Sequence, residues 1–394
     1  MRFPEFREEW EEHELSEYLD FKNGLNPKPN QFGKGIKFIS VMDILNNAVI
    51  TYDCIRASVS VSEEDMSAFS VQKGDILFQR SSETLEDVGR ANVYVDDIPA
   101  VFGGFVIRGK QKTNYNPLFF KYLLSSPLAR KRIIRMGAGA QHFNIGQEGL
   151  SKVKLPFACI DEQNKIAKIL YLLDKRISLQ NKIIEDLKKL KSAIIEKVFN
   201  GKHSEKLQLN DVGSYIRGLT YSSNDVVEHG GTLVMRSNNI INGSLLDYNN
   251  NVVFVNKQMS AEQQLQNGDV VICMANGSSS LVGKSSFYDG SCHSPITVGA
   301  FCGIYRSKEP IVKWLFQTNK YRRYIWNSLQ GGNGAIANLN GEDILNMSFS
   351  IPNATIKDTC VKMLTSVDSA LENNMSLCVL YTLQKQHLLR QMFI

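Results

Sequence analysis

The chain has 394 residues, which exceeds the roughly 100 to 200 residues of a usual domain, so its length predicts two domains. Hydrophobic residues make up 43% and charged residues 22% of the chain, which excludes an intrinsically disordered protein. The net charge of +5 is modest and decides little about the partners by itself.

The cysteines and histidines argue against disulfides and metals. The seven cysteines are odd in number and form no Cys-x-x-Cys pair, and no two of the six histidines are four residues apart. We therefore expect reduced thiols and no metal site. The sequence has no run of about 18 apolar residues, and its acidic N-terminal segment is unlike a signal peptide, so we expect a cytoplasmic protein.

Basic residues are concentrated in two parts of the chain. From Ile98 to Gln147 there is no Asp or Glu, while eight Lys and Arg residues occur. From Ser294 to Gly341, six Lys and Arg residues accompany the single acidic residue Glu309. Such segments are typical of a surface that binds nucleic-acid phosphates, and the alternative is a solvated basic helix face.

The sequence matches itself at an offset of about 194 residues. The segment GDILF at 74–78 aligns with GDVVI at 268–272. Further aligned pairs are Pro117 with Pro310, Arg130 with Arg323, Asn144 with Asn338, and Asp174 with Asp368. Because two such copies fill the chain, we interpret it as a duplication and not as a repeat array.

Each copy is expected to form a mixed, mostly strand-like domain followed by a long helix, which gives an α+β fold. The expected parts are a first mixed domain at 1–157, a long helix at 158–200, a second mixed domain at 201–353 and a long helix at 354–394. Pro117 and Pro310 are expected to open a shorter helix in each domain. Asp161 is the expected N-cap of the first long helix, and Thr355 with Asp358 has the spacing of a capping box in the second.

Both long helices carry an apolar seam. In each helix we take ten positions spaced alternately by four and three residues, from Ile166 to Val198 and from Cys360 to Met392. Eight of the ten are apolar or aromatic in each helix. This spacing is typical of a coiled coil, the alternative being an amphipathic surface helix. Because a globular domain precedes each helix, we expect the two to pair antiparallel as a pseudo-two-fold rod of roughly 55 Å.

Two seam positions are polar in both helices. In antiparallel pairing each lysine faces an apolar residue: Lys191 faces Val367 and Lys385 faces Leu173. The same pairing makes Gln180 and Asn374 neighbours at the centre, where a polar pair can fix the helix register at some cost in stability. The alternative is that Gln180 reaches solvent along the flank of the rod.

Two short segments imitate catalytic motifs. NPLF at 116–119 is similar to a motif with which amino-methyltransferases hold a target base, but its counterpart EPIV keeps only the proline, which suits helix initiation. GKSS at 283–286 lacks the glycine that a phosphate-binding loop needs five residues earlier. Glycine-rich segments at 137–146 and 331–341 are either surface loops or backbone-amide contacts to phosphate. We interpret the chain as non-catalytic.

Three blocks of sequence, together with the order of domain, helix, domain and helix, resemble one known family. RFPEF at 2–6, GDILFQR at 74–80 and, above all, LPFACIDEQNKIAKILYLLDKRI at 155–177 are similar to conserved blocks of the specificity subunit of type I restriction-modification enzymes. The second copy departs from the pattern, because Glu162 and Gln163 are replaced there by Lys357 and Asp358, or by Asp358 and Thr359.

This resemblance implies two tandem target-recognition domains, each reading one part of a split, asymmetric sequence in double-stranded DNA. It implies that the helices serve as a spacer and as a docking surface for two methyltransferase subunits, within a complex that defends against foreign DNA. This chain would bind no cofactor. S-adenosylmethionine and adenine methylation would belong to the methyltransferase subunits, and ATP, Mg, DNA translocation and cleavage to restriction subunits.

DNA contacts are expected from basic and amide side chains in equivalent places of the two domains. In the first domain they are Gln79, Arg80, Ser81, Arg90, Arg130, Lys131, Arg132, Arg135, Gln141, His142 and Asn144. In the second domain they are Arg236, Asn238, Lys284, Arg322, Arg323, Tyr324, Asn333 and Asn338. Because the loop residues differ between the domains, the two half-sites are expected to differ.

Two other interpretations stay open. The chain could be the recognition part of a different DNA methyltransferase, multisubunit or fused, for which the discriminating feature is a methyl-donor loop. It could also be a structural adaptor whose domains bind proteins, and then the basic segments would bind no DNA even at low salt.

Overall fold

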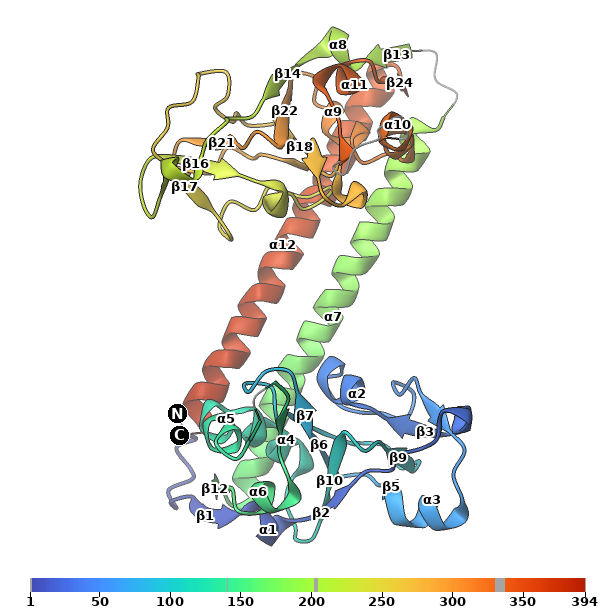
Figure 1. Cartoon of the computed structure of the whole chain (residues 1–394), viewed down its shortest axis with the longest axis vertical. Coiled ribbons are helices and arrows are strands. Elements are labelled where there is room, and N and C mark those ends of the chain that lie inside the picture. The colour runs from blue at the N-terminus through green and yellow to red at the C-terminus, as the bar shows by residue number, and fades with distance from the viewer. Residues whose placement is uncertain (1, 140, 202–204, 330–336, 394) are drawn as a thin grey trace. The chain divides into compact units, whose positions relative to one another are not determined.

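The computed structural model describes residues 2–139, 141–201, 205–329 and 337–393. They fall into two compact units (Figure 1): unit 1 lies within residues 1–181 and 376–394, and unit 2 within residues 182–375. Each unit combines a mixed α/β part with stretches of two long helices, α7 (Ile160–Phe199) and α12 (Ala354–Met392). Both long helices therefore contribute to both units.

Unit 1 is built on two four-stranded sheets. The first is antiparallel, in the order β2 (Leu19–Asn23), β10 (Val106–Gln111), β6 (Ile76–Gln79) and β8 (Ala91–Val93). The second has the order β4 (Ser58–Val59), β3 (Phe32–Ile39), β9 (Ala100–Phe102) and β5 (Ser70–Val71), with β3 and β9 parallel. Two short ladders pair β1 (Glu11–Glu14) with β12 (Lys154–Phe157), and β7 (Ser81–Ser82) with β11 (Phe143–Asn144).

Unit 2 has the same kinds of sheets. Its antiparallel sheet has the order β14 (Gly213–Arg217), β22 (Cys302–Ser307), β18 (Val270–Cys273) and β20 (Ser285–Phe287). Its second sheet has the order β15 (Val226–Val227), β17 (Val253–Val255), β16 (Thr232–Met235) and β21 (Ile296–Val298), with β16 and β21 parallel. The short ladders pair β13 (Glu205–Gln208) with β24 (Ser348–Ile351), and β19 (Ala275–Asn276) with β23 (Ala337–Asn338).

Short helices complete each unit. Unit 1 contains α1 (Leu15–Tyr18), η1 (Pro29–Gln31), α2 (Val41–Asn46), α3 (Glu63–Phe69), α4 (Pro117–Ser125), α5 (Pro127–Ile134) and α6 (Gln147–Ser151). Unit 2 contains α8 (Leu209–Val212), η2 (Ser223–Asp225), η3 (Ser237–Asn239), η4 (Ser279–Leu281), α9 (Val312–Leu315), α10 (Asn319–Leu329) and α11 (Gly341–Leu345).

The central strands are apolar on both faces because each separates two cores. In unit 1, Ile76 and Phe78 of β6 belong to one buried cluster and Leu77 to another. In unit 2, Val270 of β18 likewise belongs to one cluster and Val271 to another. Alternate residues of a strand point to opposite faces, so an uninterrupted apolar run is what such a buried strand requires.

The helix starts differ in detail from those expected. Pro117 opens α4, and the Asn116 side chain accepts the backbone N–H of Phe119 at 3.0 Å, so the NPLF segment is a helix cap here. Pro310 lies two residues before α9, which begins at Val312, so the prediction that it opens the helix was wrong.

Two predicted caps of the long helices were also wrong. Asp161 lies in the first turn of α7, whose first residue is Ile160. Helix α12 begins at Ala354, and the Asn353 side chain accepts the backbone N–H of Ile356 at 3.2 Å. Asn353 therefore acts at the start of α12, ahead of the predicted Thr355, because an amide oxygen one residue before the helix reaches its free N–H groups.

Within unit 1, the stretches of α7 and α12 run antiparallel. Asp174 pairs with Lys385 at 2.5 Å, the Arg176 guanidinium lies 5.2 Å from the centre of the Tyr381 ring, and the Cys378 thiol contacts the Asn181 amide oxygen at 3.3 Å. Rising numbers on α7 meet falling numbers on α12. Coiled-coil packing along the full helices stays a prediction.

Within unit 2, Lys191 of α7 pairs with Asp368 of α12 at 2.7 Å. The two seam lysines thus bind Asp368 and Asp174, the residues that follow their predicted apolar partners Val367 and Leu173. The pairing fits the repeat, which aligns these aspartates with one another.

Gln180 does not reach solvent. Only 6% of it is exposed, so the alternative in which it extends along the flank was wrong. The Asn374 side chain donates to the Ala370 carbonyl at 2.6 Å, one helical turn earlier. Because Gln180 and Asn374 belong to different units, their pairing stays a prediction.

Candidate nucleic-acid interface

In each unit the central strand leads into a cluster of surface loops held by the same backbone hydrogen bonds. After β6, the Arg80 N–H donates to Phe105 O at 2.8 Å, and the Arg80 carbonyl accepts from Ile145 N at 2.9 Å. After β18, the Met274 N–H donates to Phe301 O at 2.9 Å, and its carbonyl accepts from Leu339 N at 2.8 Å. We call these the loop cluster of unit 1 and the loop cluster of unit 2.

The loop cluster of unit 1 brings several predicted contacts together. Strands β7 and β11 pair Ser81 with Asn144, and the Ser81 hydroxyl donates to the Asn144 amide oxygen. Arg80 is half-buried and donates to the Gly104 carbonyl at 3.2 Å, while Gln141 and His142 are exposed beside β11. A serine, two amides, a histidine and an arginine thus lie on one loop surface, and these groups suit base edges and phosphates.

Three predicted contacts of unit 1 are engaged in hydrogen bonds or ion pairs within the fold. Gln79 is only 4% exposed, and its amide donates to Ser81 O at 2.9 Å. The Arg130 guanidinium donates to the carbonyls of Glu86 and Val88 at 2.9 and 2.6 Å, and burial lowers its pKa to about 10. The Arg130 bonds stabilise the loop that carries Arg90, and the Gln79 bond holds the start of β7, so we assign both residues to the fold.

Arg132 is the third. It donates to Lys154 O at 2.6 Å and pairs with Glu12 at 2.7 Å, which joins α5 to the β1–β12 ladder. On the same helix, Lys131 is exposed, and so is Arg135 just after its last residue. The exposed Arg90 pairs with Asp87 at 2.7 Å. Of the predicted cations, the exposed Lys131 and Arg135 can therefore reach a phosphate directly, whereas Arg90 would first have to leave Asp87.

The loop cluster of unit 2 borders a pocket of about 430 Å³. It is lined by Tyr221, Arg236, Ser237, Asn238, Gly299, Ala300, Phe301 and Cys302. The exposed Arg236 donates to Asn251 O at 3.3 Å, and Ser237 accepts from the Asn276 side chain at 3.3 Å. Two predicted base contacts, Arg236 and Asn238, thus share one pocket with two aromatic rings.

The other predicted contacts of unit 2 lie outside this pocket. On α10, Arg322 and Arg323 are exposed, whereas Tyr324 packs against Phe349 and donates its hydroxyl to Ser348 O at 2.9 Å. Lys284 is half-buried immediately before β20, and Asn338 is exposed on β23. We assign Tyr324 to the fold; Asn333 lies outside the described residues.

The Glu-Gln motif of the first long helix has a structural role. Glu162 is fully buried and accepts from Arg2 Nη2 at 2.7 Å and from Trp10 Nε1 at 2.9 Å. Gln163 accepts the Asn116 N–H at 2.9 Å and so holds the start of α4. In unit 2, Lys357 instead pairs with Glu309 at 3.0 Å. The motif therefore ties α7 to the N-terminal segment and to α4.

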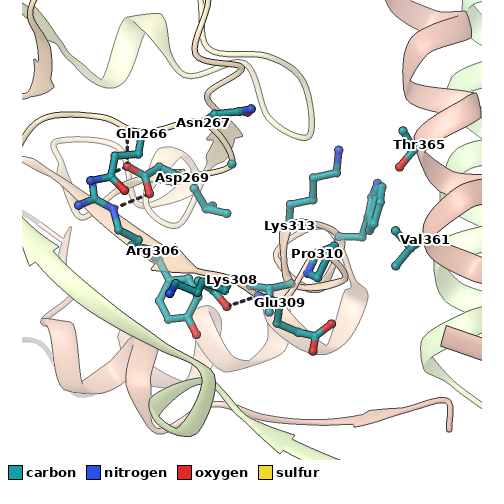
Figure 2. Close-up of a pocket in the computed structure, with 16 residues that line it drawn as sticks. Gln266, Asn267, Asp269, Arg306, Lys308, Glu309, Pro310, Lys313, Val361 and Thr365 are labelled. Carbon is teal, nitrogen blue, oxygen red and sulfur yellow. Dashed lines mark hydrogen bonds and ion pairs between the residues drawn. The ribbon is translucent and has the colours of Figure 1, made fainter. Parts of the chain in front are cut away.

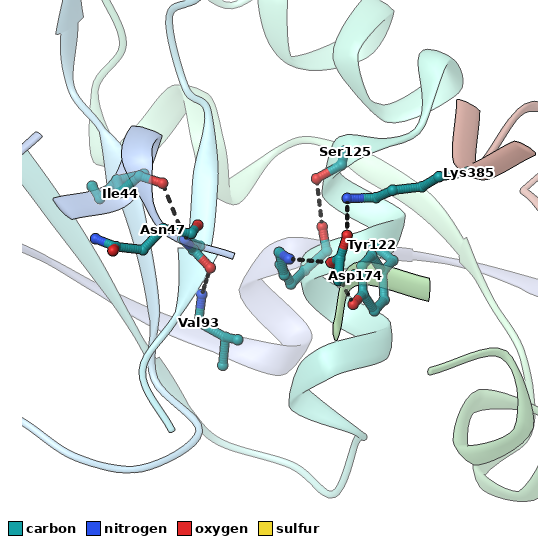
Figure 3. Close-up of polar contacts among 9 residues, drawn as sticks. Ile44, Asn47, Val93, Tyr122, Ser125, Asp174 and Lys385 are labelled. Atoms are coloured by element: carbon teal, nitrogen blue, oxygen red, sulfur yellow. Dashed lines mark hydrogen bonds and ion pairs between the residues drawn. The ribbon is translucent and has the colours of Figure 1, made fainter. Parts of the chain in front are cut away.

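Each unit also contains a buried aspartate on a long helix. Figure 3 shows Asp174 beside Tyr122 and Lys385. Its carboxylate accepts from the Tyr122 hydroxyl at 2.8 Å and from Lys121 at 3.2 Å. Burial would raise the Asp174 pKa, but the ammonium groups of Lys121 and Lys385 outweigh it and hold that pKa below its usual value.

Asp368 is the corresponding residue in unit 2. It binds Lys191 at 2.7 Å, Lys313 at 3.4 Å and the indole N–H of Trp314 at 3.0 Å. Burial lowers the pKa of Lys191, and Asp368 opposes that effect. Each aspartate thus joins both long helices to a short helix under the sheet, so the mixed part and the helices of a unit are held together.

A cavity of about 500 Å³ in unit 2 was not anticipated (Figure 2). Arg306 and Asp269 on its wall form an ion pair at 2.7 Å, and Asp269 also accepts the Gln266 N–H at 2.7 Å. Glu309 pairs with Lys357, and Lys313 pairs with the buried Asp368. These charged groups are committed to the fold and offer little to a substrate.

Sequence reasoning missed Phe105 and Phe301, which stand beside the loop clusters and are each 68% exposed. The signal that could have found them is the recurrence of Gly-x-Phe, as GGF at 103–105 and GAF at 299–301. Among the described residues, no group of three or more His, Cys, Asp and Glu is placed to hold a metal ion. Within the same residues, no helix is long and apolar enough to cross a membrane.

Comparisons with known proteins agree on one family. Residues 7–189 match the model of the type I restriction modification DNA specificity domain. The chain is 28% identical over 200 residues to the putative type I restriction enzyme MjaX specificity subunit of Methanocaldococcus jannaschii, which covers 50% of this chain and 46% of that protein. It is 33% identical over 158 residues to the type I restriction enzyme EcoKI specificity subunit of Escherichia coli K12, covering 38% and 31%.

Solved structures support the same fold. The type I restriction-modification system S subunit from M. genitalium superimposes with a TM-score of 0.63 at 15% identity, over 98% of this chain and 96% of that one. A chain from a structure of the assembly and conformational transition of the type I R-M system gives a TM-score of 0.52 at 12% identity, over 97% and 96%. The chain spans less than half the length of the curated relatives that it matches. Residues 7–189 thus match the type I restriction modification DNA specificity domain, and the chain is similar to type I restriction enzyme specificity subunits.

Proposed function

We propose that this chain selects the DNA sequence on which a type I restriction-modification complex acts. The observation that carries the proposal is the pair of loop clusters. Both are fixed by the same backbone hydrogen bonds, yet they present different side chains. Ser40–Met42 of unit 1 correspond to Arg236–Asn238 of unit 2, and Ser81 corresponds to Ala275, whereas Asn144 and Asn338 recur at the same place. A shared frame with different polar side chains fits two half-sites of a split, asymmetric target.

The affinity of each unit for duplex DNA would come from cations near the loop clusters. In unit 1 these are Lys131 and Arg135, and Arg90 would join them by exchanging Asp87 for a phosphate. The segment from 98 to 147 holds no carboxylate that would repel phosphate. In unit 2 they are Arg322 and Arg323 on α10. Phosphate contacts position a protein on DNA, and the polar side chains of the loop clusters would then select the bases.

The exposed apolar residues of the long helices support docking of two methyltransferase subunits. On α7, Leu172 and Leu179 are 55% and 59% exposed, and on α12 Leu380 and Leu383 are 60% and 54% exposed. Apolar side chains in such numbers on a helix surface are typical of a protein interface. The methyltransferase and restriction subunits would carry S-adenosylmethionine, ATP, Mg and all catalysis, and the complex would work in the cytoplasm.

The test is a genome-wide map of methylated adenines in cells with and without the gene for this chain. We expect one split, asymmetric motif to lose methylation when the gene is deleted and to regain it on complementation. An unchanged map in cells whose partner methyltransferase is expressed would contradict the proposal.

A further inference from the structure

Phe105 and Phe301 occupy the same turn in the two units. In unit 1, Val106 N donates to Gly103 O at 2.8 Å, which closes a four-residue turn between β9 and β10. In unit 2, Cys302 N donates to Gly299 O at 2.8 Å between β21 and β22. The phenylalanine is the third residue of each turn, and each is 68% exposed. Each turn connects the two four-stranded sheets of its unit, and its most exposed residue carries an aromatic ring.

The backbone of each turn is fixed from two sides. The phenylalanine carbonyl accepts from the strand end, at Arg80 in unit 1 and at Met274 in unit 2. On the other side a glycine backbone packs closely. A methyl group on Gly24 would lie 2.0 Å from Gly103 O, and one on Gly218 would lie 2.2 Å from Gly299 O. The ring is therefore held outward by a turn with little freedom to move.

Single exposed apolar side chains are common and need no explanation. These two differ because the same ring recurs at the same turn, while its neighbours change. The residues after β3 are Ser40, Val41 and Met42, whereas those after β16 are Arg236, Ser237 and Asn238. The parallel pairs Ile39–Phe102 and Met235–Val298 place these two segments at equivalent positions beside the turns.

We propose that Phe105 and Phe301 are apolar wedges that pack against the base stack of duplex DNA, one in each half-site, whatever its sequence. This inference rests on the proposed function and deepens it. A benzene ring can stack on any base, so it suits a contact that both units share. The changing neighbours, by contrast, suit base-specific hydrogen bonds. Tyr221 and Arg236 border Phe301 in the unit 2 pocket and would flank the contacted base step.

The two rings lie in the two carboxylate-poor, basic segments of the sequence, which favours DNA over a protein partner. In unit 1 the turn lies inside the segment from 98 to 147, which contains eight Lys and Arg residues and no Asp or Glu. In unit 2, the segment from 294 to 341 contains six Lys and Arg residues and only Glu309. A ring anchored on a basic, carboxylate-poor segment can approach a polyanion closely.

The experiment uses the chain assembled with its methyltransferase subunits and duplexes that carry either the mapped motif or a scrambled one. Phe105→Ala and Phe301→Ala are each expected to weaken binding to both duplexes by about tenfold, so that the ratio between them is kept. Phe→Trp at the same positions should restore affinity. Ile98→Ala and Val226→Ala, which also remove exposed apolar side chains, are the matched controls and should bind as wild type.

A second readout places 2-aminopurine at successive steps of each half-site. The wild-type complex should raise its fluorescence at one step per half-site, because a wedge unstacks the base. Phe105→Ala should abolish the rise in one half-site only, and Phe301→Ala in the other. Affinity within twofold of wild type together with unchanged fluorescence in both variants would overturn the inference. A wild-type complex that binds neither duplex would instead refute the proposed function.

Discussion

Asp174→Asn tests whether the buried aspartate holds the mixed part of unit 1 on its helices. The carboxylate binds Lys121, Tyr122 and Lys385 at 3.2, 2.8 and 2.5 Å. Asparagine keeps the shape and can still accept from Tyr122, but it removes the charge. Lys121, whose side chain is only 8% exposed, is then left as a buried cation without a counter-ion.

Removing one partner of a buried ion pair costs about 3 to 5 kcal/mol. Lys385 is 26% exposed and can turn to solvent, and Tyr122 keeps a hydrogen bond, so the lower end applies. We expect the free energy of unfolding of unit 1 to fall by about 3 kcal/mol. Urea denaturation followed by circular dichroism and by the protection of α4 amides against hydrogen exchange would measure it.

Two controls separate charge burial from loss of packing. Lys121→Met combined with Asp174→Asn removes both buried charges, keeps an acceptor for Tyr122 and should recover most of the loss, because no buried cation is left without a counter-ion. Asp186→Asn, on the same helix, removes an exposed carboxylate whose contact to Lys189 is 3.8 Å long, and it should change stability by less than about 0.5 kcal/mol. A loss below about 1 kcal/mol for Asp174→Asn, or no recovery in the double variant, would refute the reasoning.

Three further predictions concern Lys121, the exposed cations Lys131 and Arg135, and Arg130. Burial lowers the pKa of Lys121 from 10.5 to about 8, so between these pH values the unfolded chain binds more protons than the folded chain. The free energy of unfolding of the wild type should therefore rise from pH 8 to pH 10 relative to that of Lys121→Met. Parallel curves of stability against pH for the two proteins would contradict this. The double variant Lys131→Glu, Arg135→Glu should weaken DNA binding at low salt. It should also reduce the slope of log affinity against log salt concentration by about 0.9 for each lost phosphate contact. The control is Lys73→Glu, which only breaks the exposed pair with Asp97. Arg130→Met should lower the free energy of unfolding by about 1 to 3 kcal/mol, since two carbonyls lose a charged donor, yet leave the methylated motif unchanged; a changed motif would show that Arg130 reads DNA after all.

The long helices were the part of the fold that the sequence predicted best. Their apolar pattern repeats over about five heptads, so local spacing alone locates them. Helix α7 spans Ile160–Phe199, where a helix was expected at 158–200. The helix starts were less accurate, because a cap depends on which side chain reaches the free N–H groups. Asn353 does so at α12, although Thr355 and Asp358 have the better-known spacing.

The candidate site was predicted less well, because sequence shows the kind of side chain and not its contacts. Arg130 lies in the most basic segment, yet its guanidinium turns to the carbonyls of a loop some forty residues earlier in the chain. The Asp174–Lys385 pair joins residues that lie far apart along the chain, and periodicity fixed only the faces they occupy. Phe105 was missed because an apolar residue in a strand-rich segment is expected to be buried.

The central claim is that each unit reads its own half of the target. The most direct measurement is the map of methylated adenines in cells that express the chain with Arg236→Ala and Asn238→Ala, compared with the wild-type chain. We expect the half of the motif read by unit 2 to become degenerate, while the half read by unit 1 stays unchanged. A motif altered in both halves, or unaltered in both, would contradict the claim.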